Sequence, residues 1–236
     1  MTPSTSRRGS RAPSAPFGPL STVRYTVYGV SFDMLRVPPG RFIDGEGPTR
    51  RELLVSRPFE LGVAPVTQAL WRAVMGSSPS KFQGEDRPVE QVSWDDAQAF
   101  LARLSSLVLP GFRLPTEAEW VWVARCGAPT RWAGADRLKV VAVAGASQTA
   151  AVAGLSSSAV GAFDFSGNVF EWVGDGYGQA PSAGVDGQGP ASGSRRVMRG
   201  GSWLGDPQYA RVALRDYVAP GRRNSNLGVR LLRTAP

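Results

Sequence analysis

The sequence predicts an α+β fold, with two or three short helices around short antiparallel sheets joined by long loops. Helix-capping residues precede three segments with helical spacing of apolar residues, whereas several other segments alternate apolar and polar residues. The 28 Gly and 19 Pro among 236 residues favour loops over long helices. A hydrophobic content of 42% is typical of a globular protein with its own core.

The N-terminal part is expected to be a tail followed by strands. Residues 1–22 are rich in Ser, Pro, Arg and Gly, which indicates a flexible basic tail. Residues 23–35 alternate apolar and polar side chains, with β-branched and aromatic types, and therefore predict strands. A turn with a short strand is expected over 37–45, and a strand pair over 51–67. We expect one domain, spanning residues 23–236.

Capping residues place the three helices. Thr67 precedes the segment QALWRAVM as an N-cap, and Gly76 ends it. Ser93 opens a second helix, whose apolar residues recur at helical spacing up to residue 104. Thr116 and Glu119 form a capping box that opens a third, shorter helix.

The remaining elements are expected to be short. Residues 127–160 are small, polar and rich in Gly and Ala, and 178–195 are rich in Gly, Ser and Pro. Both segments are expected to be loops, the second of them at the surface. Late strands are expected over 195–203 and 227–233.

Composition excludes several kinds of chemistry. The chain has no histidine and one cysteine, Cys126, so it lacks the most common general base near neutral pH and cannot form an internal disulfide. The net charge of +8 comes almost entirely from arginine, without a lysine-rich run, so nucleic-acid binding is not favoured. No apolar run is long enough to span a membrane, and no secretory or lipidation signal is visible. A cytoplasmic monomer is the default expectation.

Five segments occur in the order typical of a known family. They are RPVEQVSWDDAQAF (87–100), GFRLPTEAEW (111–120), GAFDFSGNVFEW (161–172), RVMRGGSW (196–203) and NLGVR (226–230). These segments resemble the signatures of the formylglycine-generating-enzyme superfamily over roughly residues 35–233. The resemblance implies a variant of the C-type lectin fold.

Physical roles can be assigned to some residues of these segments. Gly200 and Gly201 allow positive φ and close backbone approach. The large indole side chains are expected in the core. Buried or half-buried ion pairs are expected between the arginines Arg113, Arg199, Arg211, Arg215 and Arg230 and the acids Glu117, Glu119, Asp164 and Glu171.

The chain departs from the enzymes of this family at their catalytic positions. The formylglycine-generating oxidase binds copper through cysteines two and seven residues beyond the aromatic residue of its GGSY or GGSW segment. Gly205 and Ala210 stand at those positions and cannot bind copper. The ergothioneine-type sulfoxide synthases need an iron site of histidines, which this chain lacks. We therefore expect no enzyme, although an unprecedented acid–base site of Asp206 with Tyr209 stays formally open.

Calcium needs only oxygen ligands, so it is considered separately. Family members often hold calcium near the GNxxEW segment. By resemblance, the side chains of Asn168 and Glu171 and the carbonyls of Gly167 and Val169 form a candidate calcium site. In the alternative interpretation, Asn168 closes a turn and Glu171 pairs with an arginine.

The C-terminal segment resembles the variable region of proteins made by diversity-generating retroelements. In such proteins a stretch from near RGGSW to near GFR is mutated at template adenines, and residues 203–230 fit this pattern. Framework-like positions in the segment are Trp203, Ala213, Arg215, Pro220, Arg223, Gly228 and Arg230. The candidate ligand-binding positions are Trp203, Leu204, Gly205, Asp206, Tyr209, Leu214, Asp216, Tyr217, Val218, Asn224 and Asn226.

Three hypotheses follow for the function. The first is a non-catalytic protein whose diversified C-terminal surface binds a protein or another macromolecule. The second is a fixed interaction or regulatory module of the same fold, with one ligand. The third, an enzyme related to the oxidase, is disfavoured by the missing cysteines and histidines.

Overall fold

The computed structural model describes residues 18–45, 47–125, 130–134, 142–178, 184–191 and 193–234. This part of the chain holds three α-helices and four small sheets, which confirms the α+β class. Most of the expected tail lies outside the described residues. Its last residues belong to the domain, because the Leu20 amide donates to the Val160 carbonyl at 3.1 Å and Leu20 packs against the core.

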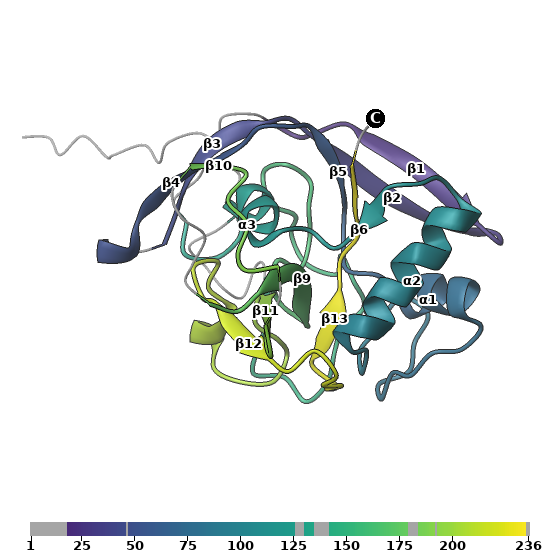
Figure 1. Ribbon diagram of the computed structural model, residues 1–236. Coiled ribbons are helices and arrows are strands. Elements are labelled where there is room, and N and C mark those ends of the chain that lie inside the picture. Colours follow the sequence, from purple (N-terminus) through teal and green to yellow (C-terminus); the bar gives the residue numbers. More distant parts are fainter. Residues whose placement is uncertain are drawn as a thin grey trace, which may run out of the picture.

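The largest sheet starts from an N-terminal hairpin and is antiparallel throughout (Figure 1). Tyr28 and Gly29 at the hairpin turn both have positive φ, as a type I′ turn requires. The C-terminal strand is inserted between two earlier strands, so both ends of the domain share one sheet. In spatial order the strands are β1 (Thr22–Val27), β2 (Val30–Val37), β5 (Phe59–Gly62), β14 (Leu232–Thr234) and β6 (Phe112–Arg113).

Three smaller sheets complete the β structure, and each contains one parallel pairing. The first consists of β10 (Gly184–Val185), β4 (Arg51–Val55) and β3 (Gly40–Asp44). The second consists of β12 (Asp216–Val218), β11 (Arg196–Arg199), β9 (Phe170–Gly176) and β13 (Leu227–Val229). The third pairs β7 (Ala142–Val143) with β8 (Ser166–Gly167).

The helices begin where the capping residues predict, and α1 also ends at the predicted Gly76. They are α1 (Gln68–Met75), α2 (Trp94–Leu107) and α3 (Glu117–Arg125), and two 3₁₀ turns, η1 (Gly47–Thr49) and η2 (Pro207–Ala210), accompany them. Thr67 Oγ1 accepts the Leu70 amide, and Gly76 ends α1 with a φ of 87°. Reciprocal side-chain and backbone hydrogen bonds form the capping boxes of α2 and α3. No helix in the described ranges is long and apolar enough to cross a membrane.

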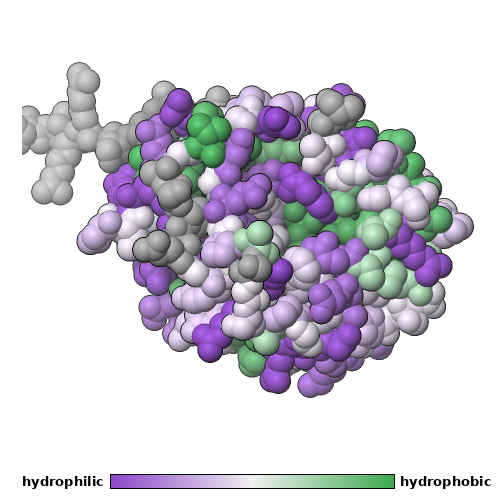
Figure 2. All heavy atoms as spheres, viewed as in Figure 1, coloured by the Kyte–Doolittle hydropathy of each residue, from purple (hydrophilic) through white to green (hydrophobic). Residues whose placement is uncertain are grey.

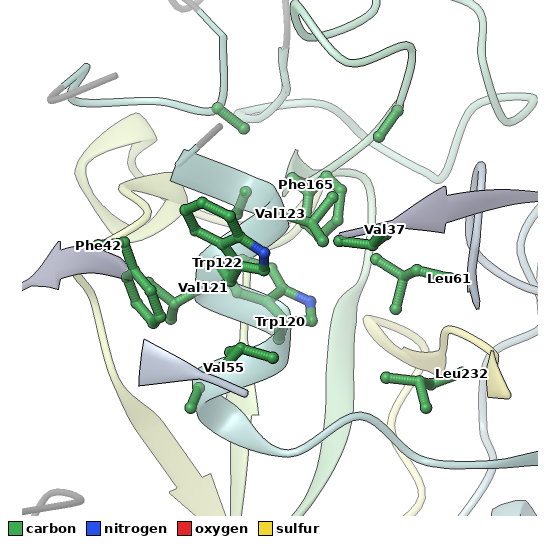
Figure 3. Packing of buried hydrophobic residues seen from close by; sticks show 14 of the residues in the cluster. Val37, Phe42, Val55, Leu61, Trp120, Val121, Trp122, Val123, Phe165 and Leu232 are labelled. Atoms are coloured by element: carbon green, nitrogen blue, oxygen red, sulfur yellow. The ribbon is translucent and has the colours of Figure 1, made fainter. Parts of the chain in front are cut away.

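Two hydrophobic clusters form the core. The first surrounds α3, with Phe42 and Val55 on one side of the helix and Leu61 and Leu232 on the other (Figure 3). The second lies between the hairpin and the helices α1 and α2. The indoles of Trp120, Trp122, Trp172 and Trp203 are buried, and each N–H group donates to a protein oxygen, which confirms their expected core role.

Candidate ligand-binding site

A buried ion pair lies under the C-terminal segment. Arg230 and Glu171 have no solvent-exposed side-chain surface, and the guanidinium donates to both carboxylate oxygens at 2.7–3.1 Å. The Trp120 indole donates to Glu171 Oε2 at 2.6 Å, and Arg230 also donates to the carbonyls of Gly62 and Phe163. Two desolvated charges are stable here because their hydrogen-bonding groups are used within the protein.

A second buried network surrounds the first turn of α3. Glu117, which is 1% exposed, accepts Arg215 Nε at 2.8 Å and lies 3.2 Å from Arg199 Nε. Arg199 also contacts Asp44, which pairs with Arg51. This network joins β3, β11, α3 and the start of β12.

Most of the expected ion pairs are confirmed. Arg113 pairs with Glu119 at 2.6 Å, in addition to the pairs of Arg199, Arg215 and Arg230. Asp164 is an exception, because its carboxylate accepts the Ala153 amide and burial raises its pKa. Arg211 donates to the Gln208 carbonyl.

The proposed calcium ligands hold the fold together in this arrangement. Glu171 is neutralised by Arg230, and Asn168, with φ of 62°, exchanges side-chain hydrogen bonds with the backbone of Ala150. The side-chain oxygens expected to face a cation therefore already face an arginine, an indole and an amide. This donor set does not fit calcium, and it matches the alternative interpretation of a turn-closing Asn and a paired Glu.

Framework positions of segment 203–230 contact the rest of the domain. Arg215 reaches Glu117, Arg223 forms a bidentate pair with Asp96 on α2, and Arg230 reaches Glu171. Gly228 is also required, because a Cβ there would lie 2.4 Å from the Val89 carbonyl oxygen. From Arg215 onward, the three arginines thus hold the segment at intervals of eight and seven residues.

Trp203, which was predicted both as a framework position and as a ligand-binding position, is held within the domain. Its side chain is only 7% exposed, and its indole donates to the Ser225 carbonyl at 2.9 Å. Its ring meets Phe82 edge-on at 5.2 Å. The preceding Gly200 and Gly201 have φ of 96° and 71°, which confirms the expected positive φ.

The first group of candidate positions is exposed. Leu204, Gly205, Asp206 and Tyr209 are solvent-exposed between the buried residues Trp203 and Ala210. A shallow hollow of about 260 Å³ lies beside them and is lined by Asp206, Gln208, Tyr209, Arg211 and Leu214. Large side chains are presented here without contributing to the core, since Leu204 is 57% exposed and Tyr209 is 55% exposed.

The other candidates are half-buried. Leu214 lies at the hollow, and Asp216, Tyr217 and Val218 form β12, the edge strand of its sheet. The Tyr217 amide donates to Asp216 Oδ1, so a side chain covers this part of the strand edge. Asn224 and Asn226 lie near Trp203, with Asn226 donating to Ser202 Oγ at 3.3 Å. The candidates therefore form several small areas on one segment.

Sequence reasoning missed a loop that supports this surface. Phe82, in the link between α1 and α2, packs on Trp203, and its amide donates to Glu90 Oε1 at 2.8 Å. Glu90 is fully buried, and its other oxygen has no hydrogen-bond partner in the described part of the chain. Burial raises the pKa of Glu90. No local pattern marks these residues, because their partners are distant in sequence.

Of the two positions expected to match the oxidase cysteines, one is exposed and the other is buried. Gly205 is exposed with φ of 122°, and Ala210 is 1% exposed at the end of η2. Cys126 lies outside the described residues. Within the described ranges no group of three or more His, Cys, Asp or Glu is arranged to hold a metal ion.

Residues 29–235 match the family described as the sulfatase-modifying factor enzyme 1-like domain. The chain belongs to this family. A solved structure, Treponema denticola variable protein 1, superposes with a TM-score of 0.85 and 32% identity, covering 91% of this chain and 99% of that chain. The fold is thus the formylglycine-generating-enzyme type of C-type lectin fold, and the chain shares it with a variable protein.

Curated relatives of the domain include enzymes. The formylglycine-generating enzyme of Streptomyces coelicolor is 36% identical over 189 residues, which cover 70% of this chain and 58% of that enzyme. Serine/threonine-protein kinase pkn1 of Chlamydia caviae is 36% identical over 157 residues, covering 61% of this chain and 23% of the kinase. The chain therefore spans well under two thirds of the length of these relatives.

The buried pair predicts that replacing Arg230 destabilises the protein far more than replacing an arginine of a surface pair. Arg230→Met is expected to lower the free energy of unfolding by about 3–5 kcal/mol, because Glu171 would remain buried without its counter-charge. The matched control is Arg24→Met, since Arg24 also makes two hydrogen bonds to one carboxylate, that of Asp33, but at the surface. The measurement is urea unfolding followed by tryptophan fluorescence. Equal losses in the two variants would contradict the role assigned to Arg230.

Glu90 predicts a pH-dependent stability difference. Burial raises the pKa of Glu90 in the folded state. At pH values between its ordinary pKa and this raised pKa, the folded state therefore binds more protons than the unfolded state. The free energy of unfolding of the wild type is therefore expected to fall, relative to Glu90→Gln, as pH rises through that window. Urea unfolding of both proteins at several pH values from 4 to 8 measures this, and a pH-independent difference would refute it.

Proposed function

We propose that this domain is a non-catalytic ligand-binding protein whose C-terminal surface is diversified, like the variable proteins of diversity-generating retroelements. The binding positions are the exposed and half-buried members of segment 203–230. Its ligand is a protein or another macromolecule. Nucleic acid is not favoured, because many arginines of this segment are engaged in hydrogen bonds within the protein.

One observation carries the proposal: the segment separates residues that hold the fold from residues that face solvent. Trp203 and Ala210 are buried, whereas Leu204, Asp206 and Tyr209 between them are exposed. Exposed loop positions on a fixed scaffold tolerate substitution with small effects on stability. Diversification needs this separation, because random changes at anchored positions would unfold the protein.

Similarity to Treponema denticola variable protein 1 supports the proposal, since it extends over nearly the whole of both chains. The oxidase activity of the enzymatic relatives is not supported. Gly205 and Ala210 have no side chain that binds copper, and the chain has no histidine for an iron site.

A fixed interaction module is the second candidate. It is favoured by the match to a kinase in which the similar segment makes up only 23% of the protein. In that case the same surface would bind one partner, and the C-terminal segment would not vary.

Sequence variation in a growing population tests the proposal directly. Deep sequencing of the 3′ end of the gene is expected to show substitutions clustered in codons 204–226, at positions derived from template adenines. Codons for the anchors Arg215 and Arg223 are expected to stay unchanged, and they serve as the internal control. A uniform 3′ end in every read would favour the fixed module.

Stability measurements test whether the surface can carry such variation. Tyr209→Ala and Leu204→Ala are expected to change the free energy of unfolding by less than about 0.5 kcal/mol, because both side chains are exposed. Trp203→Ala is expected to cost about 3–5 kcal/mol, because it removes a buried indole. Thermal and urea unfolding provide the comparison. A large loss at Tyr209 would show that this position belongs to the framework.

A further inference from the structure

Two tyrosines and two arginines form a layered stack at the end of β12. The ring centroids of Tyr177 and Tyr217 lie 3.7 Å apart. Arg215 Cζ lies 4.9 Å from the centroid of Tyr177, and Arg195 Cζ lies 4.7 Å from that of Tyr217. The order is therefore Arg215, Tyr177, Tyr217, Arg195. Tyr217 is a candidate variable position, whereas Tyr177 and Arg195 precede the variable segment.

The inner end of the stack is fixed by the buried network. Arg215 Nε donates to Glu117, which is 1% exposed, and Arg215 Nη1 donates to the Gly178 carbonyl at 2.8 Å. The Tyr177 amide donates to the Arg195 carbonyl at 2.9 Å, which connects the backbones of these two residues. The side chain of Arg215 is therefore fixed, and the ring of Tyr177 lies between it and Tyr217.

The outer end of the stack is open. Arg195 is exposed, and no ion pair of Arg195 occurs in the described part of the chain. Its neighbour Arg196 differs, because that guanidinium donates to the carbonyls of Gly174 and Ala191. A guanidinium that stacks on an aromatic ring keeps its in-plane N–H groups free, and those groups match the two oxygens of a carboxylate.

We propose that Arg195 is a fixed carboxylate-binding residue of the ligand site, oriented by the residue at position 217, and that the partner is an acidic segment of another protein. The inference rests on the proposed function and specifies its partner. An aromatic residue at position 217 supports the guanidinium, and a small residue removes that support. Variation at position 217 thus controls a contact made by a residue that does not itself vary.

The chemistry of the surroundings favours an acidic protein over nucleic acid. Nucleic-acid binding needs several free basic side chains in a row, whereas Arg196, Arg215 and Arg223 are engaged within the protein. The paired tyrosine rings offer apolar area beside one free guanidinium, a combination that is typical of protein-binding hot spots. The net charge of +8 adds a general attraction for an acidic partner.

The test uses a random copolymer of glutamate and tyrosine as the probe, with binding to the full chain followed by fluorescence anisotropy. Arg195→Glu and Tyr217→Ala are each expected to weaken binding about tenfold, because a charge-assisted hydrogen-bonded contact is lost. Arg195→Lys is expected to weaken it also, because an ammonium group cannot bind a carboxylate with two parallel hydrogen bonds.

Matched controls separate this contact from overall charge and from exposed aromatic area. Arg103→Glu changes the net charge by the same amount as Arg195→Glu, at an exposed site on α2 that lies away from β12 (Figure 1). Tyr28→Ala removes another tyrosine, which is 71% exposed. Both control variants are expected to bind the copolymer with an affinity within about twofold of the wild type, because neither touches the stack. Circular dichroism of every variant confirms that each is folded.

Three outcomes would overturn the inference. They are the absence of copolymer binding to the wild type, equal effects of Arg195→Glu and Arg103→Glu, and a duplex DNA probe that binds more tightly than the copolymer and depends on Arg195. None of them bears on variation of the C-terminal codons. Failure of this inference is therefore distinguishable from failure of the proposed function.

Discussion

The fully buried pair of Arg230 and Glu171 is the interaction on which the arrangement of this domain depends. Neither charge reaches water, so every neighbour must supply a hydrogen-bonding group in the right place. The pair and its neighbours include the central strand β9, helix α3 through Trp120, the end of β5 through the Gly62 carbonyl and the C-terminal segment. Elements distant in the sequence are thereby held in one geometry.

Two further arginine–carboxylate pairs hold the C-terminal segment: the largely buried pair of Arg215 with Glu117 and the more exposed pair of Arg223 with Asp96. Arg215 and Arg223 end at carboxylates on α3 and α2, and Arg230 ends at a carboxylate on β9. The exposed candidates Leu204, Asp206 and Tyr209 lie before these arginines, between the buried residues Trp203 and Ala210, whereas Leu227 and Val229 near Arg230 belong to the core. The hydropathy of the visible face agrees, because hydrophilic residues dominate around β11 and β12, whereas more hydrophobic area lies toward β1 and β6 (Figure 2). A binding surface here depends on polar and aromatic contacts more than on an apolar patch.

Local features of the fold were predictable from the sequence, and long-range ones were not. The caps at Thr67 and Ser93 were recognisable because a cap and its partner lie within a few residues. The place of β14 between β5 and β6 depends on pairings across more than a hundred residues, which periodicity does not encode. Arg195 and Tyr177 were missed for the same reason, since they flank a segment whose Gly, Ser and Pro content indicates only a loop. The arginines and acids of the ion pairs were predictable as residue types, whereas the contacts of Trp203 with Ser225 and Phe82 were seen only in the structure.

Gly205 and Ala210, the two positions expected to match the oxidase cysteines, differ in the constraints that their backbone imposes. Gly205 has φ of 122°, a conformation that residues with a Cβ rarely adopt, so a cysteine there would be strained without a shift of the loop. Ala210 lies against the RGGSW turn, where its Cα is 2.6 Å from the position of a Cβ on Gly201. The close contact with Ala210 requires a glycine at position 201, whereas the constraint at Gly205 falls on the matching position itself. A surface with such a backbone presents residues from its exposed turns, which suits binding and gives no support to a pair of metal-binding thiolates.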